Sequence, residues 1–236
     1  MRKIAIMQPY FLPYISYFQL INAVDAFIIY DDVNYINKGW INRNYHLSGS
    51  NSKQLFTLPL LGASQNKKIN EIDLFEFNKF KKNFLKGIEL AYKKSPYYQT
   101  VIIVINDLLN YTGNNLSEFI FQSLQKINSY LMIHTQLIAS STIYENDSLK
   151  AQERIVDICK KEGATHYINP IGGVELYSTE KFESIGLDLK FIKIGTINYK
   201  QLSEEFTPYL SIIDVMMFNS VEDIKKLLLN YELIKN

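Results

Sequence analysis

Lys3-Ile4-Ala5-Ile6-Met7, followed by Gln8-Pro9-Tyr10-Phe11-Leu12-Pro13-Tyr14, is the stretch of sequence that decides the fold. The first five residues form a short apolar run that Gln8-Pro9 ends, which is typical of a buried strand. Pro13 suits the first turn of a helix because its missing N–H would be unpaired there, so residues 14–24 are predicted as a helix. A second apolar run follows at residues 26–30. Strand, loop, helix and strand form a βαβ unit, which favours a parallel sheet with a right-handed crossover.

The remaining elements also alternate between strands and helices. Further strands are predicted at residues 40–47, 54–58, 69–74, 136–139, 166–169 and 189–192, and helices at 149–161, 211–218 and 221–233. Between residues 76 and 132 apolar residues recur at helical spacing, which predicts a block of three helices. The sequence therefore predicts an α/β fold, with a mostly parallel Rossmann-like sheet, helices on both faces and a helical insertion. We expect one domain over residues 1–236, with residues 76–132 as an insertion or lid within it.

Composition limits the classes of partner. The chain has 236 residues, of which 47% are hydrophobic, and its 25 basic and 24 acidic residues give a net charge of +1. A near-neutral chain gives no global electrostatic reason to expect nucleic acid or an anionic membrane, so a few local cations must hold any anionic ligand. The single cysteine, Cys159, excludes an internal disulfide and is predicted to pack passively. Met1-Arg2-Lys3 leads directly into a short strand, so we expect no signal peptide, no membrane insertion and a cytoplasmic location.

Three polar loops follow predicted strands. They are residues 8–14, residues 31–35 and the Asn169-Pro170-Ile171-Gly172-Gly173 turn. In open α/β sheets, ligands bind outside the carboxyl ends of the strands, so these loops are expected to converge on one site. The glycine pair can let a ligand approach the backbone closely, although an ordinary strand-to-helix turn explains it equally well.

Charged residues in and after the second loop can carry chemistry. One carboxylate of Asp31-Asp32 can bind Mg²⁺, or the pair can cap backbone amides in a turn, and strand alternation would let only one side chain enter a site. Arg43 can hold a carboxylate or phosphate with two parallel hydrogen bonds, whereas Lys38 supplies a point charge. Both flank Trp40, the only tryptophan.

The other polar candidates are less specific. The histidines, His46, His134 and His166, are far apart and have no metal-ligand spacing, so each is interpreted as structural and no metal site is predicted. Asp214, within an apolar run, is either a helix N-cap or a buried ligand group.

Residues 7–21, 31–33 and 38–44 resemble the WbqC-like family of bacterial proteins. The likeness continues through residues 163–170, Gly172-Gly173, residues 175–177, Tyr199 with Gln201, and residues 210–214. Ser16, Asn34 and Ser220 stand where the family pattern suggests Gly, Gln and Gly. Members commonly occur among genes for O-antigen or other surface-polysaccharide synthesis. The resemblance thus implies a biological setting and leaves the reaction open.

Within that setting, the resemblance favours a transferase that acts on a nucleotide-linked sugar, by acyl or aminoacyl transfer to an amino sugar. The reaction needs a base, for which Asp32 or His166 is a candidate, and donors to a developing oxyanion, such as Gln8, Asn42 or Arg43. Lys38 and Arg43 can instead hold a diphosphate. The predicted catalytic residues are Asp32, His166 and Arg43, and the predicted substrate-binding residues are Gln8, Tyr10, Asp31, Lys38, Trp40, Asn42, Asn44, Asn169, Gly172, Gly173, Tyr177, Gln201 and Asp214.

Two other classes of function stay open. One is a non-catalytic protein that binds a sugar or assembles the enzymes of a pathway. The other is an ATP-dependent ligase or nucleotidylyl transferase, because the first loop precedes a helix N-terminus that can seat a phosphate. That loop contains neither glycine nor histidine, and no His-x-x-His motif is present. The sequence requires no cofactor, and Mg²⁺, ATP and a homo-oligomer all stay open.

Overall fold

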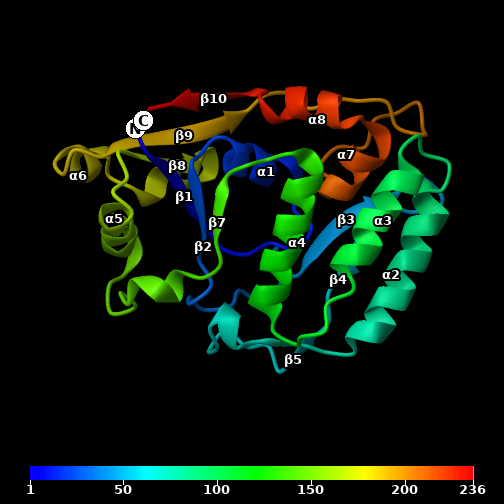
Figure 1. Ribbon diagram of the computed structural model, residues 1–236, viewed down its shortest axis with the longest axis horizontal. Helices are drawn as coiled ribbons and strands as arrows, with labels where there is room; N and C mark the ends of the chain where they lie inside the picture. The colour runs from blue at the N-terminus through cyan, green and yellow to red at the C-terminus, as the bar shows by residue number, and fades with distance from the viewer. Residues whose placement is uncertain (236) are drawn as a thin grey trace.

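The computed structural model describes residues 1–235 and contains a six-stranded central sheet (Figure 1). Five strands are parallel and the sixth, at one edge, is antiparallel to its neighbour. The strands run in the order β10 (Tyr231–Ile234), β9 (Asp188–Ile194), β8 (His166–Pro170), β1 (Lys3–Met7), β2 (Ala26–Ile29) and β7 (Gln136–Ile138). The predicted α/β class and mostly parallel sheet are confirmed.

The strand order creates a reversal in the middle of the sheet. From β1 the chain builds outward through β2 to β7, and it then returns to build outward in the opposite direction through β8 to β9. β1 and β8 are therefore neighbours whose following loops diverge. Such a reversal opens a crevice at the carboxyl ends of the two strands, where folds of this kind bind ligands.

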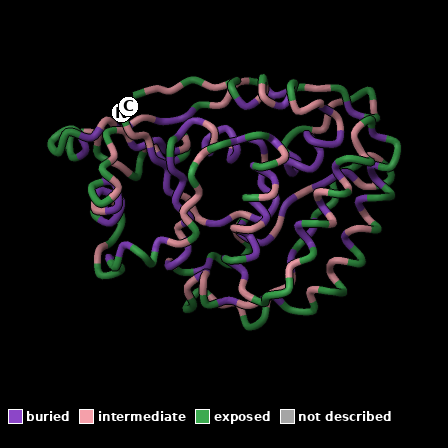
Figure 2. Tube along the Cα trace, in the orientation of Figure 1, coloured by how far each residue is buried: buried purple, intermediate pink, exposed green. Residues whose placement is uncertain are grey.

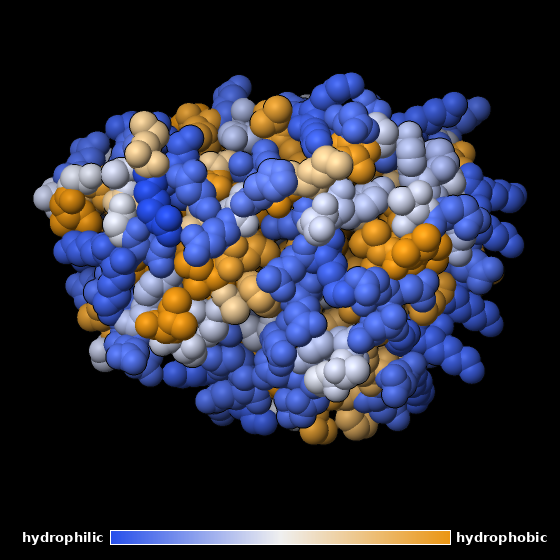
Figure 3. All heavy atoms as spheres, viewed as in Figure 1, coloured by the Kyte–Doolittle hydropathy of each residue, from blue (hydrophilic) through white to orange (hydrophobic). Residues whose placement is uncertain are grey.

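Helices cover both faces of the sheet, as predicted. On β2, Phe27 and Ile29 point into the larger core with α1 (Ile15–Asn22), while Ala26 and Ile28 point into a smaller core beneath α5 (Ala151–Lys161) and α6 (Thr179–Glu183). This alternation is the two-residue period of a strand buried on both sides. Figure 2 shows buried residues along the central strands. Figure 3 shows a mainly hydrophilic surface broken by hydrophobic patches.

The predicted block of three helices is present between β6 (Asp73–Leu74) and β7. It consists of α2 (Phe77–Tyr92), α3 (Tyr98–Leu108) and α4 (Leu116–Leu131). Asn115 caps α4 by accepting a hydrogen bond from the Glu118 N–H at 3.1 Å. The block joins the larger core, where the rings of Phe11 and Phe119 lie 5.1 Å apart. Its role as a lid stays a prediction.

The block borders a small hairpin and two C-terminal helices. β3 (Arg43–Leu47) pairs with β4 (Lys53–Thr57) and packs against α2. α7 (Ile212–Phe218) packs on α3 and β3, and α8 (Val221–Leu228) on α4 and α1. None of the helices among residues 1–235 combines the length and apolar character needed to cross a membrane.

Several predicted boundaries are wrong. The strand predicted at 40–47 begins only at Arg43, and residues 69–74 form a 3₁₀ turn, Ile69–Glu71, before the two-residue β6 (Asp73–Leu74), which pairs with β5 (Leu60–Leu61). The helix predicted to reach residue 233 ends at Leu228. Tyr231–Ile234 instead forms β10, because pairing with β9 satisfies backbone groups at the sheet edge. Short 3₁₀ turns also occur at Ser141–Tyr144 and Ile171–Leu176.

Candidate functional site

A cavity of about 570 Å³ lies at the reversal point of the sheet. Met7 and Gln8 contribute from the end of β1, Pro170 and Ile171 from the end of β8, and Ser16 from α1. Ile192 and Ile194 of β9 form another part of the wall. The volume falls within the range of small-molecule sites, and the lining is mostly apolar with few polar groups, as is usual for such sites. Position and size therefore make this cavity the candidate binding site.

A tight loop before β3 forms one side of the cavity. The Gly39 N–H donates to the Ile36 carbonyl at 3.0 Å, and a Cβ at Gly39 would lie 3.0 Å from that same oxygen. The close approach therefore favours glycine at this position. Lys38 next to it adopts a left-handed conformation with φ of 60°. This turn brings Trp40 into the cavity wall while half of its surface stays exposed.

Arg43 lies against this loop. Its guanidinium carbon is 5.5 Å from the centre of the Trp40 ring, and its Nε donates to the Gly39 carbonyl at 2.9 Å. Within residues 1–235, neither the two terminal nitrogens of Arg43 nor the Lys38 ammonium has a carboxylate or hydrogen-bond partner. Arg43 therefore lies beside Trp40 of the cavity wall with its two terminal nitrogens unpaired, and Lys38 belongs to the same loop.

Tyr10 also lines the cavity. Burial raises the pKa of its phenol, and the nearby positive charge of Arg43 offsets only part of this rise. The phenol is thus protonated at neutral pH and can donate a hydrogen bond. Tyr17 of α1, another lining residue, donates its own hydroxyl to the Gln8 carbonyl at 2.8 Å. This bond holds the first loop against α1.

Asn42 and Asn44 support the loop without facing the cavity. Asn42 accepts from the Tyr35 hydroxyl at 2.9 Å and donates to the Leu58 carbonyl at 2.7 Å. Asn44 donates to the Leu12 carbonyl at 2.8 Å. Both side chains are buried and satisfied by the protein. They therefore position the loops on which Tyr10 and Trp40 lie.

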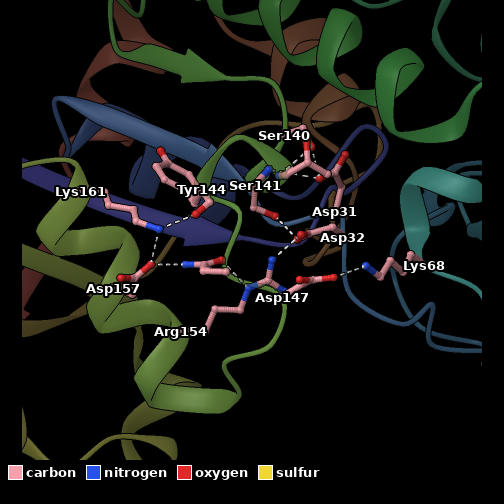
Figure 4. Close-up of polar contacts among 12 residues, drawn as sticks. Asp31, Asp32, Lys68, Ser140, Ser141, Tyr144, Asp147, Arg154, Asp157 and Lys161 are labelled. Atoms are coloured by element: carbon pink, nitrogen blue, oxygen red, sulfur yellow. Dashed lines mark hydrogen bonds and ion pairs between the residues drawn. The ribbon is translucent and has the colours of Figure 1, made fainter.

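Asp31 and Asp32 form a separate buried network beyond the end of β2 (Figure 4). Asp31 accepts from the hydroxyls of Ser117 and Ser140, both at 2.7 Å, and from the Ser141 N–H at 3.2 Å. Burial raises the pKa of Asp31, and these hydrogen bonds oppose the rise. Because β2 ends at Ile29, strand alternation does not govern the pair. Neither carboxylate lines the cavity, and the expectation that only one of them enters a site stays a prediction.

Asp32 is paired with a cation from the smaller-core side. It contacts the Ser141 hydroxyl and forms an ion pair with Arg154 of α5. The Arg154 guanidinium lies 4.8 Å from the centre of the Tyr30 ring, and its Nε donates to Asn146 at 2.9 Å. Asp32 therefore lies in a neutralised buried ion pair away from the cavity lining, and its role as a base stays a prediction. Among residues 1–235, no group of three or more His, Cys, Asp or Glu side chains could hold a metal ion.

His166 lies at the wrong edge of the sheet for a shared site. It is the first residue of β8, in register with Lys3, so it lies at the amino ends of strands whose carboxyl ends border the cavity. Its Nε2 is 3.5 Å from Asp188. His166 therefore lies apart from the cavity, and its role as a base stays a prediction.

The glycine pair and its neighbours lie on the smaller-core side. Tyr167 donates to Asn169 at 3.3 Å and is 3.2 Å from the Tyr177 hydroxyl. A Cβ at Gly173 would lie 2.0 Å from the Asn169 amide nitrogen, so any other residue there would require the Asn169 side chain to move. Nothing lies within 4 Å of a Cβ built at Gly172. The structure thus groups these residues with each other and not with Trp40.

Gln201 and Asp214 form a third cluster, apart from the cavity lining. Asp214 is fully buried and accepts from the Tyr92 hydroxyl at 3.0 Å and from the Tyr199 hydroxyl and the Gln201 amide, both at 2.7 Å. Burial raises the pKa of Asp214, and these three donors oppose the rise. Of the alternatives for Asp214, the cap is wrong, because Ser211 caps α7, and the carboxylate instead anchors the chain around Gln201.

The sequence predicts some of the residues that line the cavity and gives no sign of the others. Gln8, Tyr10 and Trp40 were expected, and the structure brings them together around one cavity. Ser16, Ile36, Ile192 and Ile194 were missed because apolar and small side chains carry no chemical signal. Only the strand order, which places β9 two strands from β1, brings the last two into the site.

The fold and cavity define a class: an α/β protein with a cavity at the reversal point of a Rossmann-like sheet. The chain belongs to the WbqC-like protein family, which matches over residues 8–226. The uncharacterized protein Rv1507c of Mycobacterium tuberculosis (strain ATCC 25618 / H37Rv) is 32% identical over 222 residues, covering 93% of this chain and 94% of the relative. No solved structure matches the chain.

Proposed function

We propose that this chain is a transferase of bacterial surface-polysaccharide synthesis that binds a nucleotide-linked sugar in the cavity between the ends of β1 and β8. The observation that carries the proposal is Arg43 beside Trp40 of that cavity: its two terminal nitrogens have no carboxylate or hydrogen-bond partner among residues 1–235, and neither has the ammonium of Lys38 in the same loop. A diphosphate supplies the charge and the oxygens that these groups lack. Family membership supports the biological setting.

The aromatic residues suit the nucleotide base. Trp40 is half exposed at the cavity, and Tyr10 lines the same space. Arg43 already lies against Trp40, so a base stacked on the indole would place its phosphates within reach of the guanidinium. Stacking of a base on an aromatic ring is worth about 1–3 kcal/mol. The base would thus be held by the ring and the diphosphate by the cations.

The proposed reaction is acyl or aminoacyl transfer to an amino group of the sugar. The amine nitrogen attacks the carbonyl carbon of an activated donor, the bond to the leaving group breaks, and the proton passes from nitrogen to that leaving group. Gln8 is the proposed donor to the developing oxyanion, because Arg43 is taken up by the diphosphate. Asp32 and His166 have no part in this version, because one is paired with Arg154 and the other lies at the opposite edge.

Calorimetric titration with a UDP-linked amino sugar, UDP and ATP tests the proposal. We expect the UDP-linked sugar to bind more tightly than ATP. A hydrogen bond to a charged group is worth about 1.5–3 kcal/mol, so Arg43→Ala is expected to weaken binding roughly 10- to 100-fold. Arg43→Lys should restore part of the loss because it keeps the charge without the two-pronged geometry.

Lys193→Ala, an exposed lysine of β9, is the control and should bind as the wild type does. Tighter binding of ATP than of the UDP-linked sugar would instead favour the ligase or nucleotidylyl transferase. Absence of binding by all three nucleotides would favour a non-catalytic scaffold. Equal affinities of Arg43→Ala and the wild type would show that the diphosphate is held elsewhere.

A further inference from the structure

We propose that the groove between β4 and α2 is a second ligand site, which binds a neutral polyhydroxylated ring through Nε2 of His46. The groove has a volume of about 300 Å³. Its walls include His46 from β3, Gln54 and Phe56 from β4, and Asn83, Phe84 and Gly87 from α2. This site is independent of the function proposed for the larger cavity.

The tautomer of His46 decides what its free nitrogen can do. Nδ1 forms a hydrogen bond with the Leu47 carbonyl, which can only accept, so we assign the proton to Nδ1. Burial lowers the pKa of His46, and the ring is therefore neutral at pH 7. Nε2 then carries a lone pair, and no donor among residues 1–235 satisfies it. A ligand hydroxyl is a suitable donor.

Gly87 leaves the edge of His46 that carries Nε2 uncovered. It lies within α2, where glycine costs about 1 kcal/mol relative to alanine. A Cβ at this position would lie 3.8 Å from Cε1 and 3.9 Å from Nε2 of His46, which is ordinary van der Waals contact. Packing therefore does not require the glycine. What its missing Cβ provides is space beside the unpaired nitrogen.

The rest of the groove matches the two surfaces of a sugar ring. The amides of Gln54 and Asn83 can exchange hydrogen bonds with hydroxyls. Phe56 and Phe84, with ring centres 5.0 Å apart, provide an apolar surface for ring carbons. Glu76 and Lys79 neutralise each other at 2.9 Å, so the groove favours a neutral ligand. Its volume equals roughly ten waters, enough for one ring.

The hairpin separates this groove from the larger cavity. Successive side chains of β3 point to opposite faces, so Arg43 lies on the side of Trp40 while His46 lies among Phe56, Phe84 and Tyr92. A ligand at His46 would therefore leave Trp40 uncovered. The two sites can be tested independently.

The test is NMR of the full chain with ¹⁵N-labelled histidine, titrated with glucose and N-acetylglucosamine. We expect a saturable shift of His46 Nε2 with at least one sugar. Gly87→Ala should weaken that binding at least tenfold because its methyl group covers Nε2, while making the protein more stable to heat. Asn83→Ala should also weaken binding, and Lys86→Ala, an exposed change on the same helix, should not.

Three results would overturn the proposal. The first is no saturable shift of Nε2 with either sugar. The second is unchanged sugar affinity in both Gly87→Ala and Asn83→Ala. The third is an equal response to cyclohexanol, which would show that the groove recognises an apolar ring and not its hydroxyls.

Discussion

Two polar regions, one directly after β2 and one at the start of β3, look alike in the sequence and differ in the structure. Asp31 and Asp32 are buried and fully paired, with three serines and Arg154 as partners. Only a few residues later, the Lys38 ammonium and the two terminal nitrogens of Arg43 have no carboxylate or hydrogen-bond partner among residues 1–235. The difference teaches that a dense polar stretch marks a ligand site only where the protein leaves some of its polar groups unsatisfied.

Burial explains why the two regions differ. A buried charge must be neutralised and hydrogen-bonded, since removing it from water costs several kcal/mol. Asp32 and Arg154 expose 5% and 4% of their side chains, so each needs the other. Lys38 is exposed and Arg43 half-buried, so water can solvate their charges until a ligand replaces it. The first region therefore stabilises the fold, and the second is free to bind.

The largest expected effect is on the free energy of unfolding, through the buried network of Asp31 and Asp32. Arg154→Ala leaves Asp32 buried without a counter-ion and should lower the free energy of unfolding by about 3–5 kcal/mol. Urea denaturation measures the change. Arg2→Ala, which breaks the more exposed pair with Glu162, is the control and should cost less. A loss below about 1 kcal/mol for Arg154→Ala would contradict the structural role of the network.

The Asp214 cluster sharpens the comparison, because this carboxylate has hydrogen bonds and no cation. Asp214→Asn disturbs three donors and should cost about 1–3 kcal/mol at low pH. Burial raises the pKa of Asp214 above its ordinary value of 3.8 in the folded protein. Folding therefore favours the protonated form, and the stability that this gives is present below 3.8 and is lost as pH rises through the folded pKa.

The stability advantage of the wild type over Asp214→Asn should consequently fall as pH rises from 3.8. Unfolding free energies of both proteins across that range measure it. Subtracting the variant removes the contribution of Asp31, whose pKa burial also raises. An advantage that grew with pH would show that the three hydrogen bonds outweigh burial at Asp214.

A smaller effect on stability is expected in the region of Lys38 and Arg43. Arg43→Ala removes one hydrogen bond and one contact with Trp40, so the free energy of unfolding should fall by about 1 kcal/mol or less. Urea denaturation beside Arg154→Ala gives the comparison directly. Similar losses for the two arginines would erase the distinction between the regions.

The smallest expected effect is on the chemical modification of the Cys159 thiol in the native protein. Its thiol is buried and unpaired, and burial raises its pKa to about 12. A thiol reagent should therefore fail to modify the native protein at pH 8 and should react fully in urea. Rapid modification of the native chain would show that α5, which also carries Arg154, opens readily.

Local patterns predicted much of the fold. The apolar run of β1, the proline before α1 and the helical spacing of residues 76–132 each act over a few residues, and the structure has the elements they predict. The helix predicted at residues 221–233 is wrong at its C-terminal end because Tyr231–Ile234 pair with β9, and pairing with a distant strand leaves no local signal.

The site was harder to predict for the same reason. Asp32 looked available because its partner, Arg154, lies 122 residues away. The opposite edges of the sheet that separate His166 from Arg43 follow from strand register, not from spacing in the sequence. Trp40, Lys38 and Arg43 were found because several polar and aromatic residues crowd one short loop. Whether each of these side chains is available to a ligand depends on whether the protein already supplies its hydrogen-bond partners, and the sequence does not show this.

Fluorescence of Trp40 is the most direct test of the central claim, because Trp40 is the only tryptophan and lies half exposed at the cavity. Titration with a UDP-linked amino sugar, excited where tyrosine does not absorb, should change the emission saturably in the wild type and in Lys193→Ala. In Arg43→Ala the same change should require at least tenfold more ligand. Unchanged emission in the wild type, or identical curves for Arg43→Ala and the wild type, would contradict the assignment of this cavity and its cations as the ligand site.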